Sequence, residues 1–497
     1  MTRGEQGGGK GSGRQAIGGD LRAGGLASAP AAAQGSAPTG GTGTTGGVPD
    51  AASHLFPNYR RLPVAFVRGE GAWLYDDEGR AWLDCTSGIG VTILGHAHPA
   101  VTEAIRRQAG ELVHCSNLYR IPQQEELARR LARLTGLDCA FFANSGAEAN
   151  EAAIKLARRY WWLTRGAGRA AGAATPAGPE APPSAPSRPA AGKPADGAGG
   201  TAATAATPAT ADRAAGEPGA PGEGPEIITF EGSFHGRTLG ALAATGQPHY
   251  HEGFHPLPPG FRHVPFNDLA AVEAAITPRT CAILVEPIQG EGGVVPAAPG
   301  FLAGLRALCD RHGLLLIADE VQTGCGRTGT FLAMQGEGVA PDVVTLAKAL
   351  ANGVPIGAML ASRRLAEVLG PGTHASTFGG NPLATAAALA TLDVLEGEDL
   401  PQRAARLGEY LRTRLVDVTR RYPGCREVRG QGLMLGLVLD GPAAPVVEAC
   451  FAEGLLVTLA GGRVVRFLPP VTITVDELDQ AVERLERALA RVGRATA

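Results

Sequence analysis

The sequence has no apolar run of about 18 residues, the length that a membrane-spanning helix requires. Its first residues include Arg3, Lys10 and Arg14, but no apolar segment follows them, so we do not expect a secretory signal. A strong charge of either sign is also missing, since the formal net charge is −3. We therefore expect a cytoplasmic protein that has neither nucleic-acid nor membrane partners.

Closely spaced cysteine pairs are missing as well. No two cysteines have the CxxC spacing that is typical of metal and redox motifs. The eight cysteines are Cys85, Cys115, Cys139, Cys281, Cys309, Cys325, Cys425 and Cys450. In a chain of 497 residues this scatter indicates reduced thiols in the core or in loops, and not a disulfide framework.

Large apolar side chains are nearly absent from two segments. Residues 166–225 contain no Val, Ile, Leu, Met, Phe, Tyr or Trp. Residues 1–50 are rich in Gly, Ala, Ser and Thr, and their sizeable apolar residues after Met1 are only Ile17, Leu21, Leu26 and Val48. Such segments cannot bury enough surface to offset the entropy of ordering, so we expect both to be disordered. The remaining 387 residues are enough for one large domain and a smaller one.

Two short apolar runs, by contrast, each end at a charged residue. Residues 314–318 are followed by Asp319, and residues 343–347 by Lys348. Such runs are typical of strands buried in a parallel sheet, and ligands lie beyond the carboxyl ends of those strands. Either residue alone would more often be an ordinary surface charge. A buried amine beside a fixed carboxylate is, however, what pyridoxal phosphate requires, because the lysine carries the cofactor and the aspartate keeps its ring nitrogen protonated.

A candidate phosphate site precedes this pair in the sequence. Ser145 and Glu148 form a predicted capping box directly after the apolar run 139–143, so a helix is expected to begin there. The amides of Gly146 and Ala147, with the hydroxyl of Ser145, would then bind an anion at the helix N-terminus. Alone, these residues indicate only a well-capped helix. Together with the strand-end pair, they favour a phosphate site.

The order of the predicted elements is typical of an α/β fold. Helices are predicted after Pro99, after Pro122 and over residues 301–311, and short strands over residues 227–230 and 281–285. Alternation of this kind predicts a mostly parallel sheet with helices on both faces.

A smaller α+β domain is expected beside this sheet. Residues 464–468 form a predicted strand, Thr474 and Glu477 are predicted to cap the last helix, and residues 71–84 to form a hairpin. The predicted organisation is a disordered tail at 1–50, an N-terminal segment at 51–98 that packs with the small domain, a large domain at 99–395 interrupted by the insert 166–225, and the small domain at 396–497.

Further motifs in the chain carry a resemblance to a known family. They are ILGHAHPAV (93–101), HCSNLY (114–119), NSGAEANEAAIKLARRY (144–160), SFHGRT (233–238), EPIQGEGGV (286–294), DEVQTGCGRTG (319–329), PDVVTLAKAL (341–350), GVPIGAML (353–360), STFGGNP (376–382), VRGQGLMLG (428–436) and VRFLPP (465–470). In this order the chain resembles the class III aminotransferases, which are pyridoxal-phosphate enzymes of fold type I, and among them the acetylornithine aminotransferases.

The resemblance implies roles for residues around the cofactor. Phe234 and Val321 would contact the two faces of the pyridine ring, and Gln322 would bind the ring hydroxyl. Thr377 would reach across a homodimer to the phosphate of the neighbouring subunit. Proton transfer is implied for Lys348, and not for His235.

It also implies how the substrates bind. Arg237 would pair with the substrate α-carboxylate, because a guanidinium binds a carboxylate in a bidentate manner, and Ser376 would assist. Glu291 and Arg466 resemble a switching pair in which Arg466 binds the second carboxylate of 2-oxoglutarate or glutamate. A permanent structural ion pair between these two residues is an alternative.

One histidine cluster falls outside this scheme. His249, His251 and His255 have a spacing that could suit a metal. No cysteine or second acidic ligand is close to them in sequence, so we predict no metal site.

The activity implied by the resemblance is transfer of the terminal amino group of N-acetylornithine to 2-oxoglutarate. The products would be N-acetylglutamate 5-semialdehyde and glutamate, as in arginine biosynthesis. Ornithine, succinylornithine, another omega-amino acid or a diamine remain alternative donors. An aminomutase or decarboxylase on the same scaffold, and a binding protein without activity, are more remote alternatives.

Overall fold

The computed structural model of this protein describes residues 54–165 and 224–496. The predicted tail (1–50) lies outside the described residues, as does the predicted insert (166–225) apart from its last two positions. The chain divides into two units, Met1–Pro63 and Val64–Ala497. In the first unit, the described residues 54–63 contain no helix or strand.

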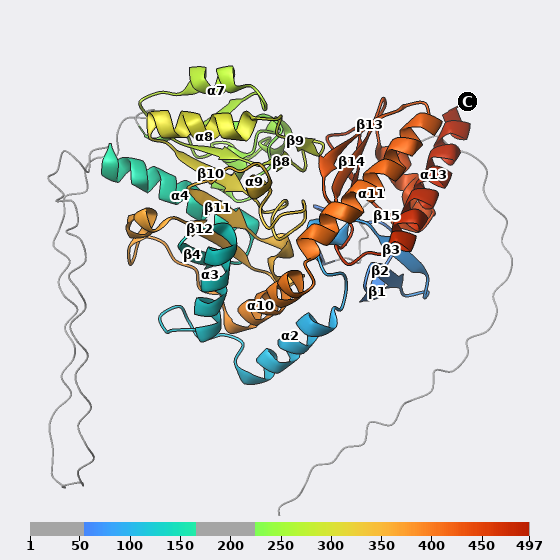
Figure 1. The fold of residues 1–497 in the computed structure, drawn as a ribbon, viewed down its shortest axis with the longest axis horizontal. Coiled ribbons are helices and arrows are strands. Elements are labelled where there is room, and N and C mark those ends of the chain that lie inside the picture. The colour runs from blue at the N-terminus through green and yellow to red at the C-terminus, as the bar shows by residue number, and fades with distance from the viewer. Residues whose placement is uncertain (1–53, 166–223, 497) are drawn as a thin grey trace, which may run out of the picture. The chain divides into compact units, whose positions relative to one another are not determined.

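The largest sheet in the second unit has seven strands in the order β4-β12-β11-β10-β7-β5-β6 (Figure 1). The strands are β4 (Cys139–Ala143), β5 (Glu226–Phe230), β6 (Phe261–Val264), β7 (Thr280–Val285), β10 (Leu315–Asp319), β11 (Val343–Leu346) and β12 (Gly357–Ala361). Six of them are parallel, and β12 is antiparallel to both of its neighbours. The predicted mostly parallel sheet is confirmed.

Helices cover both faces of this sheet. Successive side chains of a strand point to opposite faces, and β10 shows the consequence. Leu315 and Ile317 pack in one apolar cluster with α4 (Gly146–Thr164), whereas Leu316 packs in another with α8 (Phe301–His312). Because both faces are buried, the strand is apolar at every position until Asp319.

The predicted helices after Pro99 and Pro122 are present, and the helix predicted over 301–311 extends by one residue. These are α2 (Pro99–Glu111), α3 (Pro122–Thr135) and α8. Besides these and α4, the helices are α1 (Ser87–Gly90), α6 (Leu239–Ala244), α7 (Leu269–Ala275), α9 (Ala333–Gly336), α10 (Pro382–Gly397), α11 (Leu400–Arg421), α12 (Ala444–Ala452) and α13 (Val475–Thr496). Three short 3-10 helices are η1 (Pro248–Tyr250), η2 (Lys348–Ala351) and η3 (Arg363–Leu369).

Smaller sheets come from the N-terminal and C-terminal parts of the second unit. One contains β1 (Phe66–Glu70), β2 (Trp73–Asp76), β3 (Ala81–Asp84) and β15 (Leu455–Leu456), and another contains β13 (Cys425–Gln431), β14 (Met434–Leu439), β16 (Thr458–Ala460) and β17 (Val464–Phe467). A two-stranded ribbon joins β8 (Ile288–Gln289) and β9 (Val295–Pro296). The hairpin predicted within 71–84 is confirmed as β2 and β3.

The N-terminal segment pairs with the C-terminal part through Leu83 of β3 and Leu455 of β15. Both halves of the predicted capping box begin α13, since Thr474 Oγ1 accepts from the amide of Glu477 (3.2 Å) and Glu477 Oε2 accepts from the amide of Thr474 (2.8 Å). Helix α10 runs across the predicted boundary at 395/396, and the domain limits remain a prediction.

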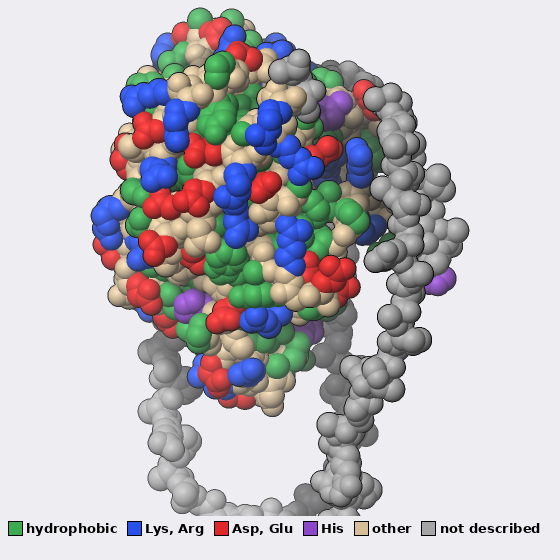
Figure 2. Space-filling model, turned by 90° about the vertical axis from the view of Figure 1, so that its right-hand side faces the viewer, with side chains coloured by type: hydrophobic (Ala, Val, Ile, Leu, Met, Phe, Trp, Pro, Cys, Tyr) green, Lys and Arg blue, Asp and Glu red, His purple; other side chains and the backbone are tan. Residues whose placement is uncertain are grey.

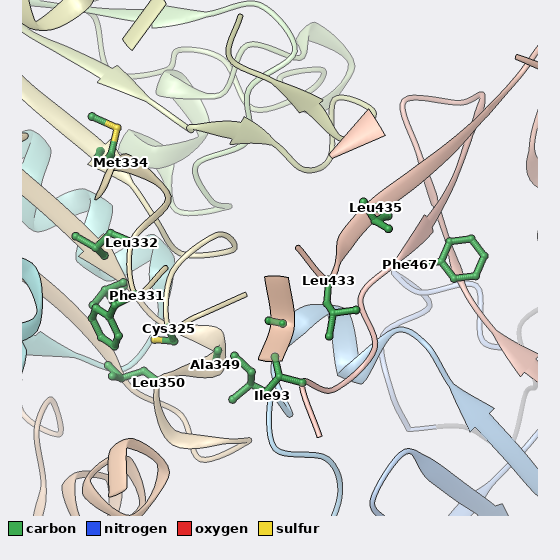
Figure 3. Packing of buried hydrophobic residues seen from close by; sticks show 14 of the residues in the cluster. Ile93, Cys325, Phe331, Leu332, Met334, Ala349, Leu350, Leu433, Leu435 and Phe467 are labelled. Carbon is green, nitrogen blue, oxygen red and sulfur yellow. The ribbon is translucent and has the colours of Figure 1, made fainter. Parts of the chain in front are cut away.

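One apolar core extends from the large sheet to the C-terminal sheet. Figure 3 shows Leu433, Leu435 and Phe467 on the C-terminal side, with Ile93 and Leu350 on the side of the large sheet (Figure 3). Because these side chains belong to one buried cluster, the C-terminal sheet is held against the segment that carries Lys348.

On the face drawn in Figure 2, acidic and basic side chains are interspersed (Figure 2). Ion pairs among the C-terminal helices, such as Arg414 with Asp479, fit this pattern. All eight cysteines are free, and six of them are buried. Among the described residues, none of the helices combines the length and the apolar character needed to cross a membrane.

Candidate active site

A cavity of about 430 Å³ opens at the carboxyl ends of β10 and β11. Its lining includes most of the residues that the sequence indicated for the cofactor. They are Ser145, Gly146, Ala147, Phe234, Arg237, Asp319, Val321, Gln322 and Lys348, together with Val91, Asn144, Asn150, His235, Gly236, Glu286, Ala347 and residues 353–356. The predicted meeting of Asp319 and Lys348 in one crevice is therefore observed.

Asp319 is fixed by three donors. Its Oδ2 accepts from Asn150 Nδ2 (2.8 Å) and from His235 Nδ1 (2.7 Å), and its Oδ1 accepts from the amide of Val321 (3.1 Å). The residue is only 4% exposed. A buried carboxylate with this many donors keeps its position, because moving it would break these hydrogen bonds and leave buried polar groups without partners.

Lys348 follows β11 directly and begins η2. Its φ of 39° is in the left-handed region, an uncommon conformation for a residue other than glycine that is often found at functional positions. Burial lowers the pKa of its amine, and Arg466 acts in the same direction, while Glu291 and Asp319 oppose the shift. A lowered pKa increases the fraction of neutral amine near pH 7.

The N-terminus of α4 faces the cavity. Ser145 Oγ accepts from the amide of Glu148 (3.2 Å), as predicted. The other half of the predicted capping box is wrong, because the carboxylate of Glu148 accepts from the amide of Asn144 (2.7 Å) and not from that of Ser145. The extended backbone at Ser145 (φ −154°, ψ 165°) brings the preceding amide to the glutamate. In this first turn, the amides of Gly146 and Ala147 have no acceptor within the helix.

Phe234 and Arg237 lie on the loop between β5 and α6. The amide of Phe234 donates to Glu286 Oε2 (2.9 Å), which fixes the start of the loop. The Arg237 guanidinium lies 3.7 Å from the ring centre of Tyr250 and 5.5 Å from that of Phe234. Arg237 is exposed and makes no ion pair with any residue that the structure describes. Its charge is therefore available to a ligand.

Glu291 and Arg466 form an ion pair beside the cavity. Arg466 Nη1 lies 2.7 Å from Glu291 Oε1 and also donates to Gln322 Oε1 (3.1 Å), while Arg466 Nε donates to Thr458 Oγ1 (3.0 Å). Burial acts to raise the pKa of Glu291, but Arg466 holds it below its usual value. Gln322 thus connects this pair to the cavity that contains Lys348.

Thr377 and Ser376 are not among the residues that line this cavity. They lie on a second cavity with Asn117 and Phe142. Ser376 Oγ accepts from the amide of Gly379 (3.0 Å) and lies 3.5 Å from Asn144 Nδ2. Within one chain, Thr377 is not brought together with Lys348.

Three polar side chains that line the cavity, those of Asn150, His235 and Glu286, were not predicted as site residues. Asn150 and His235 both contact Asp319, and Asn150 Oδ1 also accepts from Thr345 Oγ1 (2.8 Å). Burial raises the pKa of Glu286 to about 7, with Asp319 adding to the shift and His235 opposing it. The signal in the sequence was Asn150, a polar residue on the apolar face of the predicted helix.

Within the histidine cluster, His251 contacts the backbone of helix α6. His251 Nε2 lies 2.9 Å from the carbonyl oxygens of both Leu242 and Thr245. In the part of the chain that the structure describes, His, Cys, Asp and Glu side chains form no group of three or more suited to a metal.

Comparison with known proteins identifies the family. The family model of the class-III aminotransferases matches residues 56–489. The chain belongs to the class-III aminotransferases. Acetylornithine aminotransferase 1 of Bordetella bronchiseptica is 45% identical over 429 residues, which cover 86% of this chain and 95% of that protein.

Solved structures of this family have the same fold. An ornithine aminotransferase from Toxoplasma gondii has a TM-score of 0.75 and 32% identity, covering 89% of this chain and 94% of that one. The N-acetylornithine aminotransferase of Stenotrophomonas maltophilia has a TM-score of 0.68 and 35% identity, covering 88% and 98%. Class-III aminotransferases are pyridoxal-phosphate enzymes, so the cavity at Asp319 and Lys348 is the place to examine for the cofactor.

Proposed function

We propose that this protein transfers the terminal amino group of N-acetylornithine to 2-oxoglutarate, with pyridoxal phosphate bound in the cavity at Asp319 and Lys348. The products are N-acetylglutamate 5-semialdehyde and glutamate, and the enzyme acts in the cytoplasm in arginine biosynthesis. Identity of 45% to an acetylornithine aminotransferase supports the substrate. The observation that carries the proposal is the position of Arg237, which lines the cavity that contains Lys348 and has no ion-pair partner among the described residues.

The residues around the cavity fit pyridoxal phosphate. Asp319 offers a fixed, buried carboxylate to a pyridine nitrogen, and the amides of Gly146 and Ala147 with the hydroxyl of Ser145 suit a phosphate. Phe234 and Val321 provide apolar surfaces for the two faces of a ring, and Gln322 provides an amide for its hydroxyl. When bound, the cofactor supplies an aldehyde that takes up the amino group and a protonated ring that accepts electrons.

Lys348 is the residue that moves the proton. As general base, its Nζ removes a proton from the substrate carbon that bears the terminal amine. As general acid, it would then deliver a proton to the cofactor carbon that carried the aldehyde, so that the amino group stays with the cofactor. Burial and Arg466 lower its pKa, which favours the neutral form that can accept a proton. Asn150 and His235 act indirectly, because they hold the carboxylate of Asp319 in place.

Two arginines divide the recognition of the substrates. Arg237 pairs with the α-carboxylate, which N-acetylornithine and glutamate both possess. The assistance expected from Ser376 is not part of this proposal, because Ser376 lies on the second cavity. Arg466 binds the second carboxylate of 2-oxoglutarate or glutamate, and Glu291 pairs with Arg466 when a donor without that group is bound. The 2.7 Å contact between Glu291 and Arg466 supports the state in which Glu291 pairs with Arg466. If the ion pair is instead permanent, Arg466 has no part in choosing the substrate.

A homodimer completes the site in this proposal. Thr377 lies away from its own Lys348, and its neighbours Leu118, on the same cavity, and Phe378, next in sequence, are exposed. Leu112, Val113 and Tyr119, in the segment around Leu118, are exposed as well. Asn117 Nδ2 donates to the carbonyl oxygens of Ser376 and Gly379, so both exposed segments are held together. Exposed apolar patches of this kind are typical of protein interfaces. Thr377 then reaches the phosphate bound by the partner subunit.

Ornithine is the second candidate donor, because an ornithine aminotransferase has a TM-score of 0.75 to this chain. A panel of donors with 2-oxoglutarate, followed by glutamate formation, separates the two. We expect N-acetylornithine to exceed ornithine, succinylornithine, 4-aminobutyrate and putrescine in kcat/KM. Equal use of putrescine and N-acetylornithine would overturn the assignment of the donor.

Two variants test the division between the arginines. Arg237→Ala removes a charge-assisted pair, worth about 1.5–3 kcal/mol or roughly ten- to a hundredfold in the efficiency of the N-acetylornithine half-reaction. It weakens the glutamate half-reaction as well, whereas Arg466→Ala is expected to damage mainly the glutamate side. Equal damage to both half-reactions by Arg466→Ala would argue for the permanent ion pair.

A further inference from the structure

Arg237 lies between two residues that dock on helix α4. On one side, Gly236 has a φ of 141°, and a Cβ atom there would lie 2.6 Å from the Cβ of Ala147. On the other side, Thr238 Oγ1 donates to Glu151 Oε1 (2.7 Å). Ala147 and Glu151 are four positions apart, so they lie on the same face of α4, one turn from each other. The backbone of Arg237 is thus held from both sides by one helix.

Glu151 also holds the first turn of α6, which begins two residues after Arg237. The amides of Gly240 (2.9 Å) and Ala241 (3.1 Å) donate to the same oxygen that accepts from Thr238. These are first-turn amides, which need an acceptor from outside the helix. Glu151 makes no ion pair with a residue that the structure describes, so its carboxylate serves only these donors.

Gly240 makes room for this contact. A Cβ atom at position 240 would lie 2.4 Å from Glu151 Oε2 and 2.8 Å from Oε1, and its nearest neighbours are all atoms of that carboxylate. Gly240 has no positive φ, so the backbone itself does not require glycine there. The close approach of the carboxylate is the physical reason for a glycine at this position.

The far end of α6 is fixed as well. His251 Nε2 lies 2.9 Å from the carbonyl oxygens of Leu242 and Thr245, which are C-terminal acceptors of the helix. The residue before it, Tyr250, has its ring 3.7 Å from the Arg237 guanidinium. Helix α6 therefore connects Glu151 at one end with the ring beneath Arg237 at the other.

We propose that Glu151 is a positioning residue for recognition of the donor α-carboxylate: through Thr238 and the first turn of α6, it fixes the backbone from which Arg237 reaches the substrate. The inference rests on the role proposed above for Arg237. An arginine side chain loses much rotational freedom when it binds a carboxylate, so its affinity depends on a backbone that is already in the right position. Displacement of the Arg237 backbone is therefore expected to weaken binding of the α-carboxylate, while the substrate carbon that reacts, at the other end of the donor, is little affected. The effect is expected in KM and not in kcat.

Two donors that differ only in the α-carboxylate, N-acetylornithine and N-acetylputrescine, provide the test with the holoenzyme. We expect Glu151→Ala to raise KM for N-acetylornithine about tenfold, through a weakened charge-assisted pair, and to leave KM for N-acetylputrescine unchanged. Glu151→Gln keeps an acceptor oxygen and restores most of the affinity. Asp268→Ala, which removes the corresponding cap of α7 (Asp268 Oδ1 accepts from the amide of Ala271, 2.9 Å), is the matched control and changes neither donor.

Binding without turnover is measured with N-acetylnorvaline, which retains the α-carboxylate and lacks the reacting amine. Calorimetry is expected to give a Kd that rises in Glu151→Ala by the same factor as KM. Thermal melting of each variant shows whether it is folded. Gly240→Ala is a second variant that leaves Glu151 in the chain but displaces its carboxylate, so KM for N-acetylornithine rises there too.

The two substitutions act through one contact, so they are not additive. In the Glu151→Ala background, Gly240→Ala is expected to add nothing, because the clashing carboxylate is gone. Independent, additive effects would overturn the inference, as would an equal rise of KM for both donors. If Arg237→Ala raises KM for N-acetylornithine and Glu151→Ala does not, the inference about Glu151 fails while the proposed role of Arg237 stands. If Arg237→Ala has no effect, the proposed role of Arg237 fails, and the inference with it.

Discussion

Lys348 is one of only four lysines in the chain, with Lys10, Lys155 and Lys193. Borohydride reduction of the holoenzyme followed by peptide mapping should therefore label Lys348 alone. Lys348→Ala should lose this covalent linkage and reduce transamination by about 10²–10⁴-fold, the usual contribution of a general acid–base group. Lys155→Ala, whose amine contacts His374 at the surface, is the control and should keep the label. Labelling of any other lysine would refute the site.

Glu320 gives the site region a pH dependence of stability. Burial raises its pKa to about 7 from 4.5, although Thr323 Oγ1 and the amide of Met334 donate to it. Between those values the folded protein holds a proton that the unfolded chain has released. The stability linked to this group is therefore full below pH 4.5 and is lost as the pH rises through 7.

Glu320→Gln removes this titration and keeps the shape of the side chain. From about pH 5 to about pH 8, the parent should lose about 1–3 kcal/mol of unfolding free energy relative to the variant. Denaturant unfolding at the two pH values, at equal protein concentration, measures the difference. Glu286, whose pKa is also raised to about 7, is present in both proteins, so its contribution to the change in unfolding free energy cancels in the comparison. Parallel pH profiles would contradict the burial argument.

Single residues were predictable where sequence order placed them at strand ends. Asp319 and Lys348 follow apolar runs, and neighbouring parallel strands bring their ends together. Asn150 and His235 reach Asp319 from a helix and a loop far away in sequence, and no spacing rule predicts such a contact. The role of Glu151 was hidden for the same reason, because its partners lie about ninety residues later in the chain.

At the scale of elements, the approach of α4 to the loop after β10 is tight. A Cβ atom at Gly146 would lie 2.7 Å and 3.0 Å from the two methyl carbons of Val321. Gly146→Ala should therefore shift either the helix N-terminus or Val321, at an overpacking cost of about 1–3 kcal/mol. Both residues line the cavity, so we expect pyridoxal phosphate to bind roughly ten- to a hundredfold more weakly in equilibrium dialysis.

Val321→Ala supplies the rescue. The double variant Gly146→Ala/Val321→Ala should recover most of the affinity, because the methyl groups that clash are removed. Gly110→Ala in α2, where a Cβ atom meets nothing within 4 Å, is the matched control and should bind the cofactor normally. Failure of the rescue would mean that Gly146 is needed for its own approach to the ligand.

Periodicity predicted which elements form, but not the direction of every strand. The strand β12 is buried at all five positions, and an apolar run of this kind reads the same in either direction. Its antiparallel place between β11 and β4 follows from the chain path, which returns through η2 without a crossover helix. The capping prediction at Ser145 failed in one half for a comparable reason, since a glutamate can reach either of two neighbouring amides.

At the scale of the whole molecule, two distant parts of the sequence build one sheet. Strand β15 pairs with β3, and the apolar core joins both parts to the segment around Lys348. The sequence predicted that the N-terminal segment packs with the small domain, but not this strand pairing, because two-residue strands such as β15 have no periodicity to detect. The same limit applies to the proposed dimer, since the exposure of Leu118, Tyr119 and Phe378 depends on loop conformation.

Complementation between subunits tests whether the proposed site is shared. Thr377→Asp would place a negative charge against the phosphate of the partner subunit, and Lys348→Ala inactivates its own subunit, so neither variant should be active alone. In a mixed dimer, the subunit that retains Lys348 receives an intact Thr377 from its partner, and one site works. Random pairing of equal amounts makes half of the dimers mixed, so about a quarter of the parent activity should return. If Thr377 instead served its own subunit, that site would carry the aspartate and no activity would return. The two purified variants are denatured, mixed and refolded together, and each variant refolded alone is the control. The activity that returns decides between the two arrangements.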